Sequence, residues 1–348
     1  MSLSLTDLLR PLANPQILTL VLVLAVGSGL VLHFSSAMAP FITAFVVAYL
    51  LERGVKLLQG WRVPRLMAVT VVFGLFLLLL NLFLFGVLPI LMQQLTRLLG
   101  DLPRMIETFR TITAKLSDAV AGLIPAEFSE KLLLGIVTSF QDMVASSVST
   151  LLQQLPGLVS LLLYLFLVPF LVFFFLKDKD ELLDSIRQLI PRDRHLLRQV
   201  FNEVNIGVGG YVYGKFWELS LLGAITYLVF TIMAVPYASL LALLTGLSVL
   251  IPFLGVAVVA IPVLAIGLFQ GGMEWEALHP LMAYGILQLV DANILTPLIL
   301  GETVHVHPVS IMLAVFIFGS LWGIPGVFFA VPLAVLVKSV VKAIHDNS

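Results

Sequence analysis

Hydrophobic residues follow one another along most of this chain in runs too long for the core of a soluble domain. The longest charge-free run extends from Leu219 to Met273, without a single Asp, Glu, Lys, Arg or His. One membrane-spanning helix needs about 20 apolar residues, so this run is long enough for more than one crossing. The pattern predicts an all-α, polytopic integral membrane protein with about eight transmembrane segments.

The composition supports this fold class and narrows the chemistry. Hydrophobic residues make up 60% of the 348 positions and charged residues only 11%, whereas soluble domains have about 25% charged residues. The net charge of −1 gives no reason to expect a nucleic-acid partner. The chain has no cysteine, which excludes disulfides, thiol catalysis and cysteine-based metal sites.

The N-terminal half divides into two regions. Residues 1–91 hold the first three predicted spans, at 16–33, 38–51 and 66–91. In residues 92–155, charged side chains recur at helical spacing with Leu and Ile between them, which predicts amphipathic helices broken at Pro103 and Pro125. We expect this second region to form an extracytoplasmic helical arm that packs on the membrane surface or on neighbouring subunits.

Residues 156–348 form the predicted transmembrane core, with a charged cytoplasmic loop at 177–204. Three of its segments have the length of ordinary spans: 157–176, 207–233 and 281–300. Two others, 238–270 and 309–341, are interrupted by proline and glycine. The interrupting residues are Pro252 and Gly255 in the first segment and Gly323, Pro325 and Gly326 in the second.

The interruptions leave short apolar pieces, about 13 and 15 residues in segment 238–270, and each is shorter than one crossing requires. Such segments fit either re-entrant hairpins or discontinuous helices, whose open backbone groups can line a substrate path. The sequence alone does not distinguish these two forms of broken hairpin.

Lys and Arg are unevenly distributed between the two predicted sides of the membrane. One side would carry 13 of them, at Arg10, in the 52–65 and 177–204 loops, and at Lys338 and Lys342. The other side would carry only five, all within the arm. Basic residues favour the cytoplasmic side, so we expect both termini to be cytoplasmic.

The first candidate site is the pair Lys215 and Glu218, three residues apart at the entrance of the charge-free run. Residues at this spacing share one face of a helix. The pair could be a proton-linked or substrate-linked charge pair in a cavity. Alternatively, Lys215 extends its side chain to the lipid headgroups. That explanation fits Glu218 less well, because it lies one turn deeper.

The second candidate site surrounds Asp291, in the middle of the segment 281–300, with Gln288 and Asn293 nearby. Pro297 has no N–H to donate to the carbonyl of Asn293, so that oxygen becomes available. An acid, two amides and a free carbonyl could coordinate a cation or bind a polar solute. The alternative is a buried hydrogen-bond network between helices. We favour function, because a carboxylate is costly inside a membrane.

Other features give weaker signals. His305 and His307 alternate as metal ligands can, but no third ligand is visible at a suitable spacing, and Pro308 indicates the start of a helix. Gly210 and Gly214 have the spacing of a helix-packing motif. No phosphate-binding loop, nucleophile elbow, zinc signature or dinucleotide fingerprint occurs, so we expect no enzyme activity, cofactor or metal.

Taken together, the C-terminal motifs form a recognisable pattern. They are Gly214-Lys215, Ile251-Pro252-Phe253-Leu254-Gly255, Gln288-x-x-Asp291-x-Asn293-x-x-x-Pro297, His307-Pro308 and Gly319-x-x-Trp322-Gly323-x-x-Gly326-Val327-Phe328-Phe329-Ala330. This pattern resembles the AI-2E (autoinducer-2 exporter) family, most closely its PerM-type permeases. The resemblance implies an inner-membrane, multi-pass transporter that forms a homo-oligomer. In this family, export of autoinducer-2 and sodium/proton antiport have each been linked to some members.

We therefore expect a permease or secondary transporter that exports a small polar solute, driven by a Na⁺ or H⁺ gradient or by the solute's own gradient. The predicted path contains Lys215, Glu218, Gln288, Asp291 and Asn293, and its backbone is shaped by Pro252, Gly255, Pro297, Gly323, Pro325 and Gly326. Its partners would be the lipid bilayer, the solute and further copies of the chain in a cyclic homo-oligomer. The alternative is a passive channel or an oligomeric membrane scaffold without coupled transport.

Overall fold

The computed structural model describes five stretches of the chain and four single residues, and every element in them is helical. The stretches are 35–120, 158–189, 195–252, 254–300 and 307–346, and the single residues are Lys131, Gly135, Thr138 and Asp142. The predicted span 16–33, the predicted break at Pro125 and the histidine His305 lie outside the described residues.

The chain forms two compact units, which we describe separately. The first comprises Met1–Leu80, Leu162–Phe216 and Pro297–Ser348, and the second comprises Asn81–Leu161 and Trp217–Thr296. Helices α4 (Arg65–Leu82) and α9 (His195–Ile232) each contribute to both units.

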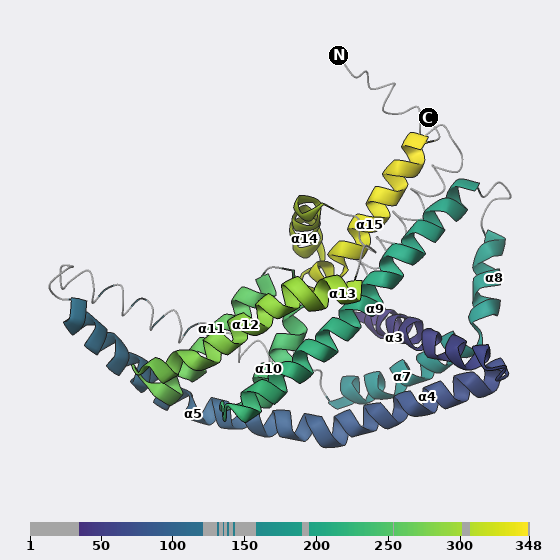
Figure 1. Ribbon diagram of the computed structural model, residues 1–348. Coiled ribbons are helices and arrows are strands. Elements are labelled where there is room, and N and C mark those ends of the chain that lie inside the picture. The colour runs from purple at the N-terminus through teal and green to yellow at the C-terminus, as the bar shows by residue number, and fades with distance from the viewer. Residues whose placement is uncertain are drawn as a thin grey trace, which may run out of the picture. The chain divides into compact units, whose positions relative to one another are not determined.

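The first unit is helical wherever the structure describes a regular element (Figure 1). Its helices are α3 (Ser35–Gly60), most of α4, most of α7 (Leu158–Lys177), α8 (Lys179–Leu189), the first part of α9, most of α13 (Thr296–Leu300), α14 (Pro308–Trp322) and α15 (Ile324–Asp346). Small and β-branched side chains, among them Ala44, Ala48, Val69 and Val172, fill the core between α3, α4 and α7. Such side chains let helices approach closely.

A single residue separates α14 from α15. Gly323 has φ +65° and ψ −140°, a conformation that glycine adopts without steric cost, and α15 begins at Ile324. The prediction that the break extends to Gly326 is therefore wrong. Pro325 lies in the first turn of α15, where helices tolerate proline because the missing N–H needs no partner there.

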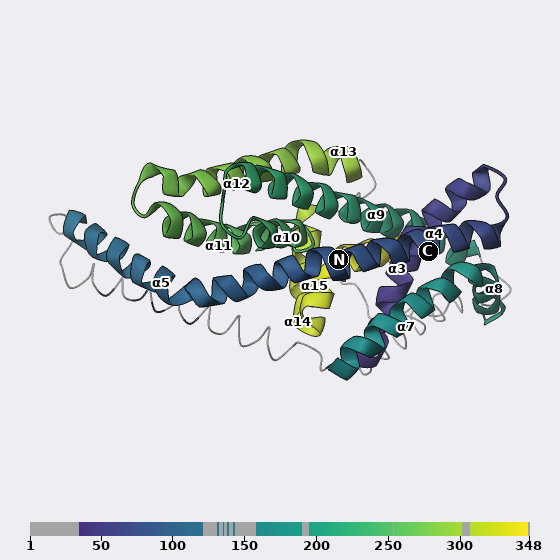
Figure 2. The same ribbon diagram turned by 90° about the horizontal axis from the view of Figure 1, so that it is seen from below.

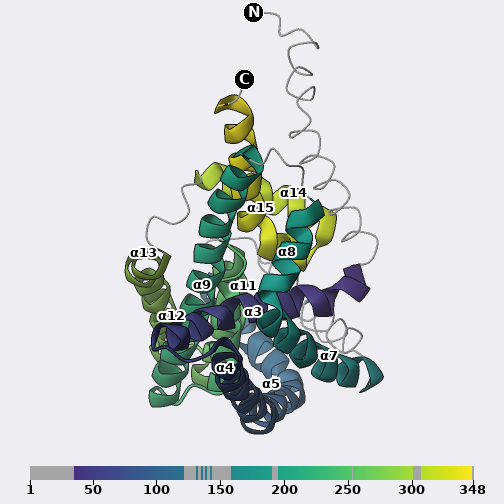
Figure 3. The ribbon, with the colours of Figure 1, turned by 90° about the vertical axis from the view of Figure 1, so that its right-hand side faces the viewer.

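Apart from a bend at Asp178, residues 177–204 are helical wherever the structure describes them, rather than an irregular loop. Helix α7 ends at Lys177, the chain bends at Asp178, and α8 leads away from it (Figure 3). Helix α9 begins as early as His195, about three turns before the predicted span. The high charge density suggested a loop, but α8 is an amphipathic helix, in which charged residues occupy one face.

In the second unit, α10 and α11 pack along α5 (Figure 2). Its elements are the π turn η2 (Phe83–Val87), α5 (Leu88–Val120), the rest of α9, α10 (Ala238–Ser248), α11 (Leu254–Gly271), η3 (Trp275–Leu278), α12 (His279–Val290) and the π turn η4 (Asp291–Leu295). Met105, Phe230, Val263, Ile266 and Tyr284 form its buried core.

Helix α5 continues through Pro103, so the predicted break at that residue is wrong. Proline removes one hydrogen bond. Leu98, Leu102 and Met105 flank it and pack against the core of the second unit, and this burial offsets the loss. The start of the arm therefore packs on its own chain, whereas we had expected the membrane surface or a neighbouring subunit.

The segment 238–270 does break near Pro252, between a helix of 11 residues and a helix of 18 residues. At 1.5 Å per residue, α10 is only about 16 Å long and cannot cross a bilayer by itself. A Cβ atom on Gly255 would lie 1.9 Å from the carbonyl oxygen of Ser248. The close approach of α11 to the end of α10 therefore requires glycine at this position.

Within the described residues, four helices are long and apolar enough to cross a membrane: Arg65–Ile112, Asn205–Ile232, Leu254–Gly271 and Trp275–Leu300. Shorter apolar helices accompany them. Large apolar side chains such as Phe85, Phe166 and Leu298 are more than two-thirds exposed, as expected for surfaces that face lipid. The described chain is thus an all-helical, polytopic membrane protein.

Candidate functional site

Glu218 lies on the buried face of α9. Its neighbours at intervals of four residues, Leu222, Thr226 and Phe230, are fully buried, and Glu218 itself is only 2% exposed. Residues at this spacing follow one stripe of a helix. A carboxylate has therefore been placed where the helical pattern otherwise puts apolar side chains. Burying an ionisable group in this way is costly, and such groups are usually functional inside membranes.

Thr296 is the hydrogen-bond donor that the structure identifies for Glu218. Its hydroxyl donates to Glu218 Oε1 across a distance of 3.2 Å. Thr296 begins the short helix α13 (Thr296–Leu300), directly after the π turn η4. Its backbone N–H donates to the carbonyl of Asp291, five residues earlier, and this bond closes the π turn.

Proline explains where the π turn occurs. Pro297 has no N–H, so the α-helical bond to the carbonyl of Asn293 cannot form and the regular ladder is interrupted. The other π turn, η2, also precedes a proline. One residue lies between η2 and Pro89, and one residue, Thr296, lies between η4 and Pro297. In both helices an interrupted ladder is accommodated by widening one turn.

The π turn separates the residues that the sequence grouped around Asp291. Asp291 is buried, with 8% exposure. Asn293 is exposed and its amide donates to the carbonyl of Leu289 at 2.8 Å, so this side chain bonds to its own helix. Gln288 is half-buried and flanks the hydroxyl of Tyr284. The structure thus places Asp291 and Gln288 toward the interior and Asn293 toward the outside.

Buried hydroxyl groups on α10 and α12 extend this polar region, and sequence analysis missed them. Tyr284 donates to the carbonyl of Val256 at 2.9 Å, and Ser248 lies beside it. Ser248 donates to the carbonyl of Thr245 at 2.7 Å. The sequence does contain a pattern that could have identified this region: hydroxyl and amide side chains at helical spacing within apolar segments. The pairs are Thr245 with Ser248 and Tyr284 with Gln288.

Lys215 is half-buried on α9 and belongs to the first unit, whereas Glu218 belongs to the second. The glycine before it, Gly214, allows close packing, because a Cβ atom there would lie 2.3 Å from Leu300 Cδ2. The predicted use of Gly214 as a packing residue is consistent with this contact. The remaining predicted backbone residues, Pro252 and Gly255, lie at the α10–α11 turn described above.

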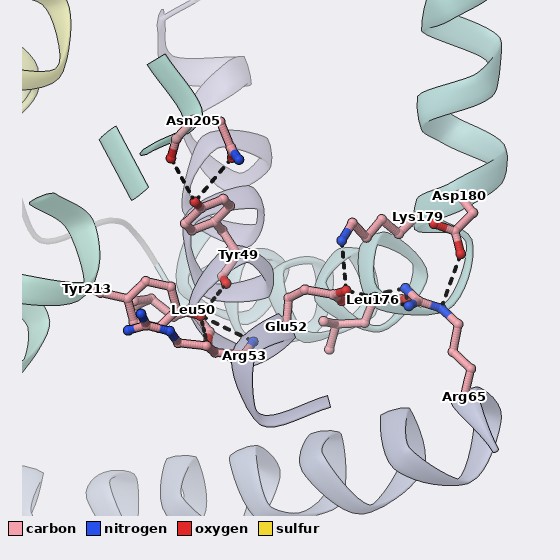
Figure 4. A network of polar contacts seen from close by, with 10 residues as sticks. All are labelled: Tyr49, Leu50, Glu52, Arg53, Arg65, Leu176, Lys179, Asp180, Asn205 and Tyr213. Carbon is pink, nitrogen blue, oxygen red and sulfur yellow. Dashed lines mark hydrogen bonds and ion pairs between the residues drawn. The ribbon is translucent and has the colours of Figure 1, made fainter. Parts of the chain in front are cut away.

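The first unit contains an ion-paired cluster that sequence analysis also missed (Figure 4). Glu52, with a side chain only 11% exposed, accepts from Lys179 Nζ at 2.7 Å and from both terminal nitrogens of Arg65 at 3.5 Å. Arg65 also donates to the carbonyl of Leu176 at 2.7 Å and lies 3.8 Å from Asp180. One buried carboxylate thus joins α3, the start of α4 and the α7–α8 corner.

Tyrosines form a second part of this polar network (Figure 4). The hydroxyl of Tyr213 contacts the carbonyls of Tyr49 and Leu50, and the guanidinium of Arg53 lies 4.4 Å from its ring centroid. The hydroxyl of Tyr49 reaches Asn205 at 3.3 Å. These contacts fix α3 against α9. In the sequence, Arg53 and Arg65 counted only among the basic residues of the 52–65 loop, which predicted the orientation of the chain in the membrane.

Within the described residues, no group of three or more His, Asp or Glu side chains could hold a metal ion. His307 caps α14, since its Nδ1 accepts the backbone N–H of Val309 at 3.3 Å. This role agrees with the interpretation of His307 as a residue at the start of a helix.

The described chain is a polytopic membrane protein, with a helix pair broken at Pro252 and buried carboxylates inside its apolar segments. Comparison with known proteins identifies its family. The model of the AI-2E family transporter matches residues 17–346, and the chain belongs to this bacterial family of multi-pass permeases and transporters.

Several relatives align over most of their length. Putative permease PerM of Escherichia coli K12 is 39% identical over 97% of this chain and 96% of its own. Putative transport protein YrrI of Bacillus subtilis is 28% identical over 88% of this chain and 85% of its own. AI-2 transport protein TqsA of E. coli K12 is 26% identical, covering 86% of this chain and 83% of its own.

Proposed function

We propose that this protein is a secondary transporter that exports a small polar solute across the bacterial inner membrane, coupled to a Na⁺ or H⁺ gradient. The observation that carries the proposal is the pair of buried carboxylates, Glu218 with 2% and Asp291 with 8% exposure, in apolar helices. Buried acids in such helices are expensive and typically mark a substrate or ion pathway. The relative named as an AI-2 transport protein supports autoinducer-2 or a similar polyol as the first solute to test.

Each predicted site residue has a role in this proposal. Glu218 and Asp291 bind the coupling ion or the hydroxyl groups of the solute, and Gln288 extends the polar surface beside Tyr284. Lys215 and Asn293 line the ends of the path rather than its buried centre. The interruptions at Pro252, Gly255, Pro297 and Gly323 allow the helices that carry the path to bend.

The proposed topology places both termini in the cytoplasm, residues 92–155 outside it, and about eight membrane segments in all. The short helix α10 supports a re-entrant position for the α10–α11 pair, because 11 residues cannot cross a bilayer. We also propose a cyclic homo-oligomer. A cysteine introduced at Asp118 of this cysteine-free chain should react only with reagents added from the periplasmic side.

The decisive experiment measures flux in proteoliposomes. Thermal-shift screening with AI-2 and related polyols first identifies a bound solute, because a ligand that binds the native state raises its melting temperature. Uptake of that solute is then measured with and without a Na⁺ or pH gradient. Asp291→Asn keeps the shape of the side chain and removes its charge, and it should abolish gradient-driven flux while leaving membrane insertion unchanged.

The exposed neighbour offers a matched control. Asn293→Ala alters a polar side chain in the same π turn that bonds only to its own helix in the described contacts, so flux should fall far less. If wild-type protein moves the solute only down its gradient, whatever ion gradient is applied, the protein is a passive channel. If Asp291→Asn transports like wild type, the carboxylate is a packing contact and the proposed path is wrong.

A further inference from the structure

We propose that Thr296 is a positioning residue that links the Glu218 carboxylate to the π turn carrying Asp291. This inference rests on the proposed function of the Glu218 and Asp291 site and adds a residue that the sequence did not suggest. Thr296 makes two different bonds. Its side chain donates to Glu218 Oε1 at 3.2 Å, and its backbone N–H donates to the carbonyl of Asp291.

The direction of the Thr296 side chain is unusual for this chain. Six other threonines within helices donate their hydroxyl to the carbonyl four residues earlier, which is the ordinary local partner of threonine in a helix. They are Thr43, Thr70, Thr96, Thr108, Thr111 and Thr245. Thr296 instead donates its hydroxyl to a residue of another helix, α9.

The N–H of Thr296 has two possible backbone acceptors. In an α-helix, the N–H of Thr296 would donate to Ala292, whereas in the observed π turn it donates to Asp291. The next residue, Pro297, has no N–H and therefore does not stabilise either register. The N–H of Thr296 is thus the last backbone donor that distinguishes the two registers before the proline.

Glu218 biases this choice because it holds the side chain of the same residue. As long as the hydroxyl of Thr296 donates to the carboxylate, Thr296 stays in the position from which its N–H reaches Asp291. When a cation or a solute hydroxyl takes that carboxylate oxygen, Thr296 is released and its N–H can turn to Ala292. Occupancy at Glu218 would then change the orientation of Asp291, which is the coupling that an ion-driven transporter needs.

The test reads the conformation of the turn directly and does not depend on flux. Because the chain has no cysteine, a single Ala292→Cys carries a trifluoromethyl label at an exposed position of the π turn, and ¹⁹F NMR reports its conformations. Thr296→Val keeps the shape of the side chain and removes the hydroxyl. We expect a roughly five-fold change in the population ratio of the two registers, the size that follows from losing one net hydrogen bond.

Three further variants make the result specific. Thr296→Ser restores the hydroxyl and should restore the wild-type spectrum. Thr245→Val is the control, because Thr245 is a more deeply buried helical threonine that donates to Leu241 of its own helix, and it should leave the label unchanged. Glu218→Met removes the hydrogen-bond acceptor and should shift the ¹⁹F spectrum as Thr296→Val does. In the Glu218→Met background, adding Thr296→Val should cause no further change in the spectrum.

The outcomes separate this inference from the proposed function. A spectrum that Thr296→Val leaves unchanged, or that Thr296→Val still alters in the Glu218→Met background, would overturn the link. If Thr296→Val does not fold, Glu218→Met alone decides, and an unchanged spectrum in that variant rejects the proposal. A label that responds as expected in a protein without coupled flux would support the link and reject the transporter instead.

Discussion

Two buried glutamates in this protein make different contacts. Glu52, in the first unit, contacts Lys179 at 2.7 Å and Arg65 at 3.5 Å. Glu218, in the second unit, is more deeply buried: its whole-residue exposure is 2%, against 9% for Glu52. Its carboxylate accepts a hydrogen bond from the neutral hydroxyl of Thr296. Glu52 is bound by cations of its own chain, which suits it to hold helices together. Glu218 accepts a neutral hydroxyl on the buried face of an apolar helix, and in the proposed function it binds and releases an ion.

The largest effect should come from Glu218→Gln. The amide still accepts the hydroxyl of Thr296, so folding should be little changed, but the group can no longer bind a cation or a proton. We expect gradient-driven flux to fall roughly ten-fold or more, as when a charged interaction of 1.4 kcal/mol or more is lost. Flux per folded molecule in proteoliposomes measures this effect. If the Glu218→Gln protein transports normally but unfolds at a lower temperature, Glu218 stabilises the fold and does not take part in transport.

Glu52→Gln should have the opposite profile. The substitution leaves Arg65 and Lys179 without their carboxylate partner at a partly buried position, and we expect a loss of about 2 kcal/mol in unfolding free energy. Flux per folded molecule should stay close to wild type. The exposed carboxylate Asp180, which lies 3.8 Å from Arg65, gives a matched control, because Asp180→Asn should cost less than about 0.5 kcal/mol. Chemical unfolding of the three proteins in one detergent compares them.

Lys179→Met divides the contributions within the cluster. It removes the shorter ion pair of Glu52 and keeps the bidentate contact with Arg65, and methionine preserves most of the apolar stem. The expected loss is about 1 kcal/mol, smaller than for Glu52→Gln because one cation remains. Equal losses for the two variants would show that Arg65 contributes nothing measurable at 3.5 Å.

The smallest effect concerns a third acid, Asp101, outside the buried sites. The hydroxyl of Tyr237 donates to its carboxylate at 2.5 Å. Burial, and then the hydrogen bond with Asp101, raises the pKa of Tyr237 from 10 to about 12. A folded-state pKa above the unfolded value means that the contact stabilises fully below pH 10. This stabilisation is lost as the pH rises from 10 to 12.

Tyr237→Phe should therefore reduce the loss of stability between pH 9 and pH 12 while changing flux little. Thermal melts at several pH values measure it, with Tyr227→Phe as the control, because Tyr227 is an exposed tyrosine on α9. Identical alkaline curves for wild type and Tyr237→Phe would show that the contact with Asp101 does not contribute to stability.

The sequence predicted the features that depend on local runs of residues. Apolar runs gave the membrane class, and Pro252 with Gly255 located the turn between α10 and α11. Local reasoning failed at Pro103, where packing of Leu98 and Met105 outweighs the loss of one hydrogen bond. It also mistook the amphipathic helix α8 for a loop, because charge density alone does not show which face the charges occupy.

The polar clusters could not be predicted in this way. Lys179 is 127 residues from Glu52 in the chain, and Thr296 is 78 residues from Glu218. Side chains this far apart meet only through tertiary packing, which one sequence without an alignment does not reveal. Glu218 and Asp291 stood out because an acid in an apolar run is conspicuous, whereas Thr296 is unremarkable in any helix until its partner is known.

The two π turns also determine where this protein can change length. A π turn holds one residue more than the α-helical turn it replaces, and each residue of an α-helix turns the chain by about 100°. Deleting one residue from Phe83–Val87 or from Asp291–Leu295 would remove the widened turn and leave regular helix on both sides. These two sites are therefore where relatives with single-residue length differences inside a span should differ, and where such a change would rotate a functional side chain without breaking the helix.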